Sequence, residues 1–140
     1  MKKLAITLLF TALPLLSAAC SSTGVTDSGK VIKSAPVGNN LIVTLSNRDG
    51  VLKNGGNEFF VSFKDGSGQP VDVGAVGLNF HMPAMGTMQE MNNAATFVST
   101  GSPGVYEGEV KLESAGDWQA QISYEGAAGR GKSSFTLTAQ

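Results

Sequence analysis

The sequence is short of the side chains that many enzymes and disulfide-stabilised domains depend on. It contains one cysteine, Cys20, and one histidine, His81. A single cysteine excludes an intrachain disulfide, and no serine lies in a nucleophile-elbow sequence that could form a catalytic triad with His81. The glycine clusters lack the lysine and the strand-to-helix context of a phosphate loop. We therefore predict that the protein is not an enzyme and that packing alone stabilises its fold.

Charge is also scarce and nearly balanced. Ten Lys and Arg stand against 11 Asp and Glu, which gives a formal net charge of −1. The chain has no basic stripe and no acidic tail, so nucleic acid is not expected as a partner. Glu107 and Glu109 alternate with apolar residues beside Lys111, and we interpret them as the solvated face of a strand.

Long apolar runs are confined to the N-terminus. Lys2 and Lys3 precede an apolar stretch over residues 4–16, and small residues follow before Cys20, a pattern typical of a secretion signal. The stretch is too short for a permanent membrane span and contains Pro14. This N-terminus resembles that of bacterial lipoproteins, in which the cysteine at this place is lipidated. The alternative is an ordinary signal peptide followed by a free thiol.

These features predict three segments. Residues 1–19 are expected to be a signal peptide. Residues 20–38, rich in Ser, Thr, Gly and Lys, are expected to be the lipidated Cys20 and a flexible tether. Residues 39–140 are expected to be one folded domain. The protein would then be exported and anchored to a membrane, which would be the outer membrane if the organism has one.

Period-two alternation of apolar and polar residues recurs through the predicted domain. It indicates strands near residues 41–45, 59–64, 76–82, 95–97, 106–112, 118–124 and 135–137, separated by Gly, Asn and Asp turns. We therefore predict an all-β protein, an immunoglobulin-like antiparallel β-sandwich of about seven strands. Trp118 is expected in its core.

Residues 81–91 hold His81 and every methionine except the initiator: Met82, Met85, Met88 and Met91. Methionine is usually scattered through a core as a gap-filler, so this concentration calls for a separate explanation. Thioethers favour Cu(I), and imidazole binds copper in either oxidation state. The segment is therefore a candidate copper site.

The local conformation limits which of these donors can meet. The spacing of three would suit a helix face, but Pro83 and Gly86 favour a strand end followed by a loop. In a regular strand His81 and Met82 point to opposite faces. We therefore expect His81, Met85 and Met88 to form the site, with Met82 and Met91 as further candidates.

An ordered set of motifs resembles the YtkA-like domain, which is related to FixH-like domains. The motifs are residues 56–63, the turn at 65–71, the run His81 to Gly86, residues 104–106 and residues 116–118. The resemblance implies an exported immunoglobulin-like sandwich associated with copper handling or respiratory-oxidase assembly. The Met-Pro-x-Met-Gly signature falls on Met82, Pro83, Met85 and Gly86, and so keeps Met82 as a candidate ligand.

Three hypotheses for the methionines follow. In the first, the loop binds Cu(I) and buffers it or passes it to a protein partner. In the second, the loop docks on a membrane complex such as an efflux pump or an oxidase, because methionine makes adaptable apolar contacts. In the third, the methionines close one end of the core against Phe80, Phe97 and Trp118.

Overall fold

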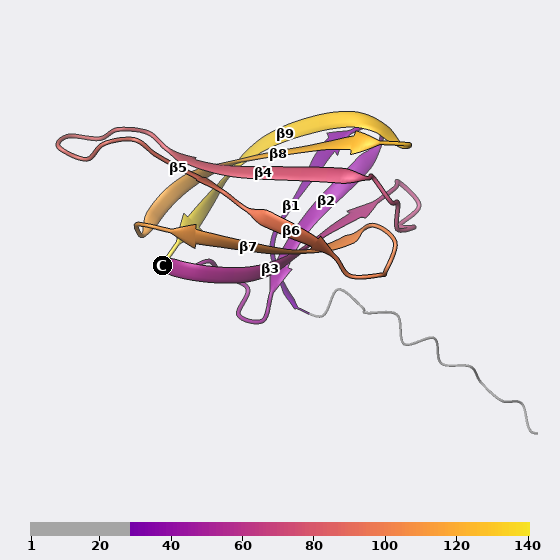
Figure 1. Ribbon diagram of the computed structural model, residues 1–140, viewed down its shortest axis with the longest axis horizontal. Helices are drawn as coiled ribbons and strands as arrows, with labels where there is room; N and C mark the ends of the chain where they lie inside the picture. The colour runs from indigo at the N-terminus through magenta and orange to yellow at the C-terminus, as the bar shows by residue number, and fades with distance from the viewer. Residues whose placement is uncertain (1–28) are drawn as a thin grey trace, which may run out of the picture.

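The computed structural model describes residues 29–140, which form two antiparallel β-sheets packed face to face (Figure 1). The predicted signal peptide and Cys20 lie outside these residues. The strands are β1 (Lys30–Gly38), β2 (Leu41–Asn47), β3 (Gly55–Lys64), β4 (Ala75–Met82), β5 (Met91–Ala94), β6 (Thr96–Ser99), β7 (Val105–Leu112), β8 (Gly116–Gly126) and β9 (Gly129–Ala139).

One sheet has the order β1-β2-β3-β7-β6 and the other β5-β4-β8-β9. The prediction of an all-β antiparallel sandwich is confirmed, with β1 and β5 as additional strands. Within the described part of the chain, no helix is long and apolar enough to cross a membrane.

The core lies between the two sheets, where most strands direct alternate apolar side chains inward. Phe59 of one sheet makes an edge contact with Phe80 of the other, with ring centroids 6.4 Å apart. Phe63 and Tyr124 make a second such contact between the sheets, at 5.7 Å. Trp118 is fully buried, as predicted, and its indole N–H donates to the carbonyl of Ser114 at 3.0 Å. These aromatic pairs fix the spacing of the sandwich.

The folded domain begins earlier than the sequence predicted. The sequence predicts a tether over residues 20–38, but residues 30–38 form edge strand β1, which pairs with β2. The pairing shifts register between Val31 and Lys33 and again between Pro36 and Gly38. These irregularities break the period-two pattern, and Pro36 is tolerated because β1 lies at the edge of its sheet. That is why alternation did not reveal the strand.

Tyr106 holds the segment of chain that leads into β4. The Tyr106 hydroxyl donates to a carboxylate oxygen of Asp72 at 3.0 Å and accepts from the Val73 N–H at 3.3 Å. The Gly74 N–H donates to the same Asp72 oxygen. The hydrogen bonds from Gly74 and then Tyr106 lower the pKa of Asp72, while burial, followed by the Asp72 hydrogen bond, raises the pKa of Tyr106.

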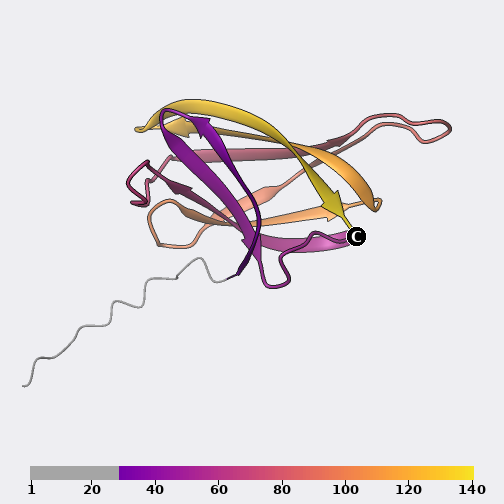
Figure 2. The ribbon, with the colours of Figure 1, turned by 180° about the vertical axis from the view of Figure 1, so that it is seen from behind.

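At the other end of β4, the chain leaves the body of the sandwich as a long narrow hairpin. Figures 1 and 2 show it projecting beyond the neighbouring strands before it returns into β5. Strand β8 runs beside β4 only as far as the pair His81 and Gln119. Residues 83–90 therefore extend past the sheet, and this hairpin contains the methionine-rich segment.

Candidate functional site

The segment between β4 and β5 is an antiparallel ribbon that keeps the register of the two strands. Met82 pairs with Met91, and the same register places Met85 opposite Met88 at the tip. Gly86 and Thr87 form the two-residue turn, with a φ of 58° at Gly86. Glycine at the first central position fits a type II′ turn, whose twist matches that of paired strands. The chain therefore folds here as a hairpin, whereas the sequence predicts a loop after the strand.

Met85 and Met88 form a cross-strand pair at the tip of the ribbon. The Met85 N–H donates to the Met88 carbonyl at 3.1 Å, and the Met88 N–H donates to the Met85 carbonyl at 2.9 Å. Directly opposed residues of an antiparallel pair present their side chains on the same face, with Cβ atoms about 5 Å apart. The two residues are 60% and 45% exposed. The structure thus brings together two accessible thioethers, which we call the tip pair.

Met82 and Met91 lie where the ribbon leaves the sandwich, and we call them the inner pair. Their environment is different. Met82 is 2% exposed and belongs to the hydrophobic core, and Met91 is half-buried against that core. Cβ of an alanine at position 116 would lie 3.4 Å from the Met82 Cε, so this side chain reaches the start of β8. The inner pair closes one end of the core, a role that the third hypothesis gave to all four methionines.

His81 lies on the opposite face of β4 from Met82, as strand parity predicted. Its Nδ1 is 2.9 Å from the side-chain oxygen of Asn92, directly across the ladder. An amide oxygen only accepts, so Nδ1 is the donor, and in the neutral imidazole Nε2 then has the lone pair that could bind a metal or accept a hydrogen bond. Asn92 was missed in the sequence, although the Gly86-Thr87 hairpin turn gives the register that pairs it with His81.

The ribbon does not gather the predicted ligands around one point. Met85 is four residues beyond His81, which corresponds to about 13 Å along an extended strand. Strand side chains stand roughly perpendicular to the backbone, and copper bonds are near 2 Å, so His81 does not share an ion with the tip pair in this conformation. The five candidate ligands therefore separate into the tip pair, the inner pair and His81.

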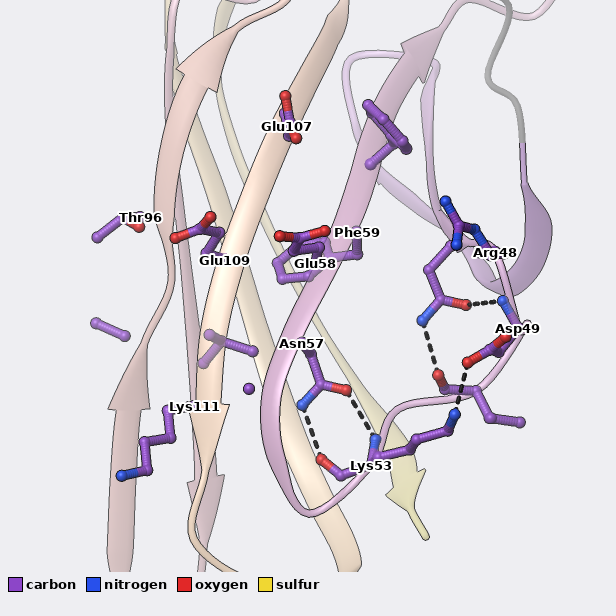
Figure 3. Close-up of a pocket in the computed structure, with 16 residues that line it drawn as sticks. Arg48, Asp49, Lys53, Asn57, Glu58, Phe59, Thr96, Glu107, Glu109 and Lys111 are labelled. Carbon is purple, nitrogen blue, oxygen red and sulfur yellow. Dashed lines mark hydrogen bonds and ion pairs between the residues drawn. The ribbon is translucent and has the colours of Figure 1, made fainter.

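A concave region lies on the outer face of the β1-β2-β3-β7-β6 sheet. It is a groove of about 1030 Å³ (Figure 3). Glu58 and Glu109 face each other across β3 and β7, and Glu107 precedes Glu109 by two residues on β7. All three carboxylates are exposed, which agrees with the predicted solvated face. Within residues 29–140, no group of three or more His, Cys, Asp or Glu side chains could hold a metal ion.

Among the described residues, no ion pair joins a basic side chain of this groove to Glu58, Glu107 or Glu109. Lys53 pairs with Asp49 at 2.6 Å instead, and Figure 3 shows this contact away from the glutamates. Asn57 donates to the Lys53 carbonyl and accepts from the Lys53 N–H, so it fixes the loop that borders the groove. The polar groups at this border hold the loop, and we assign no chemistry to the groove.

The model of the YtkA-like family matches residues 36–123. The chain belongs to the YtkA-like family. The match begins within β1 and ends within β8, so it includes the whole methionine hairpin. The resemblance inferred from the motifs is therefore confirmed. Among curated proteins, no significant match to the chain is found.

Proposed function

We propose that this YtkA-like protein is an exported, lipid-anchored Cu(I)-binding protein that buffers copper or delivers it to a partner. The observation that supports the proposal is the tip pair, two accessible thioethers held side by side at the end of a projecting hairpin. Thioethers are soft neutral donors that favour Cu(I). They need no deprotonation, so the site can keep its metal at mildly acidic pH.

The tip pair provides two protein ligands. Met85 and Met88 would hold Cu(I), while Met82 serves the core and His81 lies farther down the ribbon. A two-ligand site leaves the ion open to an incoming donor from a partner, and ligand exchange then moves the metal without unfolding the hairpin. The lipid on Cys20 would keep the domain at the membrane surface, where membrane-bound partners are found.

An anaerobic titration with Cu(I), or with Ag(I) as its redox-inert analogue, tests the proposal on a protein comprising residues 21–140. We expect one equivalent to bind, competed by a chelator. The double variant Met85→Leu/Met88→Leu keeps the volume and apolarity of the tip but removes both sulfurs. It should weaken binding at least tenfold, or about 1.4 kcal/mol.

The double variant Met82→Leu/Met91→Leu is the matched control, because it also removes two sulfurs from the same ribbon. Its affinity should remain that of the unmodified protein. Equal losses in the two double variants, or no loss at the tip, would reject the assignment to Met85 and Met88. The single variant His81→Ala measures any contribution from the imidazole.

The exposure of the tip pair also favours a second function, docking on a membrane complex such as an efflux pump or an oxidase. Two exposed methionines on one face provide an adaptable apolar contact. The same leucine variants separate the two functions in cells. Docking survives Met85→Leu/Met88→Leu and is lost in Met85→Gln/Met88→Gln, whereas copper transfer is lost in both.

A further inference from the structure

Oxidisable side chains in the sandwich differ sharply in their access to solvent. Residues 29–140 contain no cysteine, and the only tryptophan, Trp118, is fully buried. Methionine sulfur is then the most readily oxidised group that the described part of the chain can present. Met82 is 2% exposed, whereas Met85 and Met88 are 60% and 45% exposed. Only the tip pair offers both of its sulfurs to a small oxidant.

The surroundings of the tip leave both methionines largely uncovered. Each residue from Pro83 to Glu90 is exposed, and the ribbon projects past the end of the sheet (Figure 2). An alanine Cβ placed at Gly86, between the two methionines, would meet nothing within 4 Å. An oxidant therefore reaches Met85 and Met88 without any opening of the fold, whereas Met82 becomes accessible only when the core opens.

We propose that Met85 and Met88 are a modification site, oxidised by hydroperoxides to methionine sulfoxide, and that this oxidation weakens Cu(I) binding at least tenfold. The second part rests on the proposed function. In the reaction the thioether sulfur attacks the outer peroxide oxygen, the O–O bond breaks, and an S=O bond forms. Sulfur loses two electrons, the peroxide gains them, and water or an alcohol leaves.

The chemical change reverses the properties of the tip. A sulfoxide is polar and presents a hard oxygen, so it lacks the soft thioether that favours Cu(I). The apolar character that suits docking is lost at the same time. The fold should be unaffected, because the backbone hydrogen bonds between Met85 and Met88 do not involve the sulfurs. Oxidant exposure would thus release copper from an intact domain.

Timed exposure of the residues 21–140 protein to dilute hydrogen peroxide, followed by peptide mass spectrometry, tests the site without any metal. We expect Met85 and Met88 to gain one oxygen each at least about tenfold faster than Met82, with Met91 between them. Comparable rates at Met82 and the tip would overturn the site assignment. Unchanged thermal unfolding after the tip is oxidised would show that the domain remains folded.

Silver titration of the tip-oxidised protein tests the consequence. We expect its Ag(I) affinity to fall at least tenfold, and bound Ag(I) to protect Met85 and Met88 from peroxide while leaving the rate at Met91 unchanged. Full affinity after oxidation would overturn the switch. If the unoxidised protein binds no Ag(I), the proposed function and the switch fail together, while the order of oxidation rates still decides the modification site.

Discussion

The two ends of one short hairpin use the same amino acid for different purposes. At its base, Met82 and Met91 pack on the core, and at its tip, Met85 and Met88 are largely exposed. All four lie within ten residues and share one register. The difference arises because β8 covers β4 only as far as His81, so the base belongs to the sandwich and the tip does not. A methionine-rich segment is therefore not a single functional unit.

Truncating one methionine at each end of the hairpin should give the largest difference in stability between the two ends. Met82→Ala removes a buried side chain from the core and should lower the free energy of unfolding by about 2–5 kcal/mol. Met85→Ala, at an exposed position, should change it by less than about 0.5 kcal/mol. Urea unfolding of the two variants gives the comparison. Similar losses in both would mean that the tip also packs on the domain.

Substitution of two glycines, one at each end of the hairpin, compares the two ends through backbone strain. Gly116 stands against Met82 at the base with a φ of 123°, and Gly86 forms the tip turn with a φ of 58°. Alanine at position 116 should cost about 1–3 kcal/mol, and alanine at position 86 about 1 kcal/mol. A type II′ turn requires at Gly86 a backbone conformation that only glycine adopts readily, so asparagine should not recover stability at either position. Thermal unfolding of the alanine and asparagine variants tests this.

The base of the hairpin also contains an unsatisfied polar group. The side-chain nitrogen of Asn93 on β5 is buried and is the one such side-chain atom without a hydrogen-bond partner in the described residues. Asn93→Val should therefore stabilise the domain by about 1 kcal/mol, because valine removes the desolvation cost and suits a strand. The neighbouring Asn92→Val is the control, since it loses the hydrogen bond to His81 and gains nothing. A loss of stability in Asn93→Val would contradict the interpretation.

Acid should affect the two ends of β4 differently, and this is the smallest of the expected effects. Hydrogen bonds hold the pKa of Asp72 below its ordinary value of 3.8. The unfolded chain therefore takes up this proton first, and the stabilisation, complete above pH 3.8, is lost as the pH falls toward the folded pKa. Asp72→Asn should make the acid unfolding curve shallower. Ag(I) binding at the tip should not follow this titration, because thioethers carry no proton.

Much of the fold was predictable from alternation and turn residues. Regular strands such as β3, β4, β7 and β8 follow a simple period of two and were identified in advance. Strand β1 was missed because its two register shifts hide the inward positions. Strand β5, Met91–Ala94, carries little apolar signal of its own, and its pairing with β4 is what defines it.

The sequence alone determined that soft donors are concentrated between residues 81 and 91, and that His81 and Met82 face opposite ways, because strand parity is a local property. Only the tertiary structure decided which sulfurs are accessible. Exposure depends on where pairing with a neighbouring strand ends, and β8 pairs with β4 only as far as His81 and Gln119, although β8 itself starts at Gly116. The extent of this pairing is set between residues far apart in the chain, which no local pattern records.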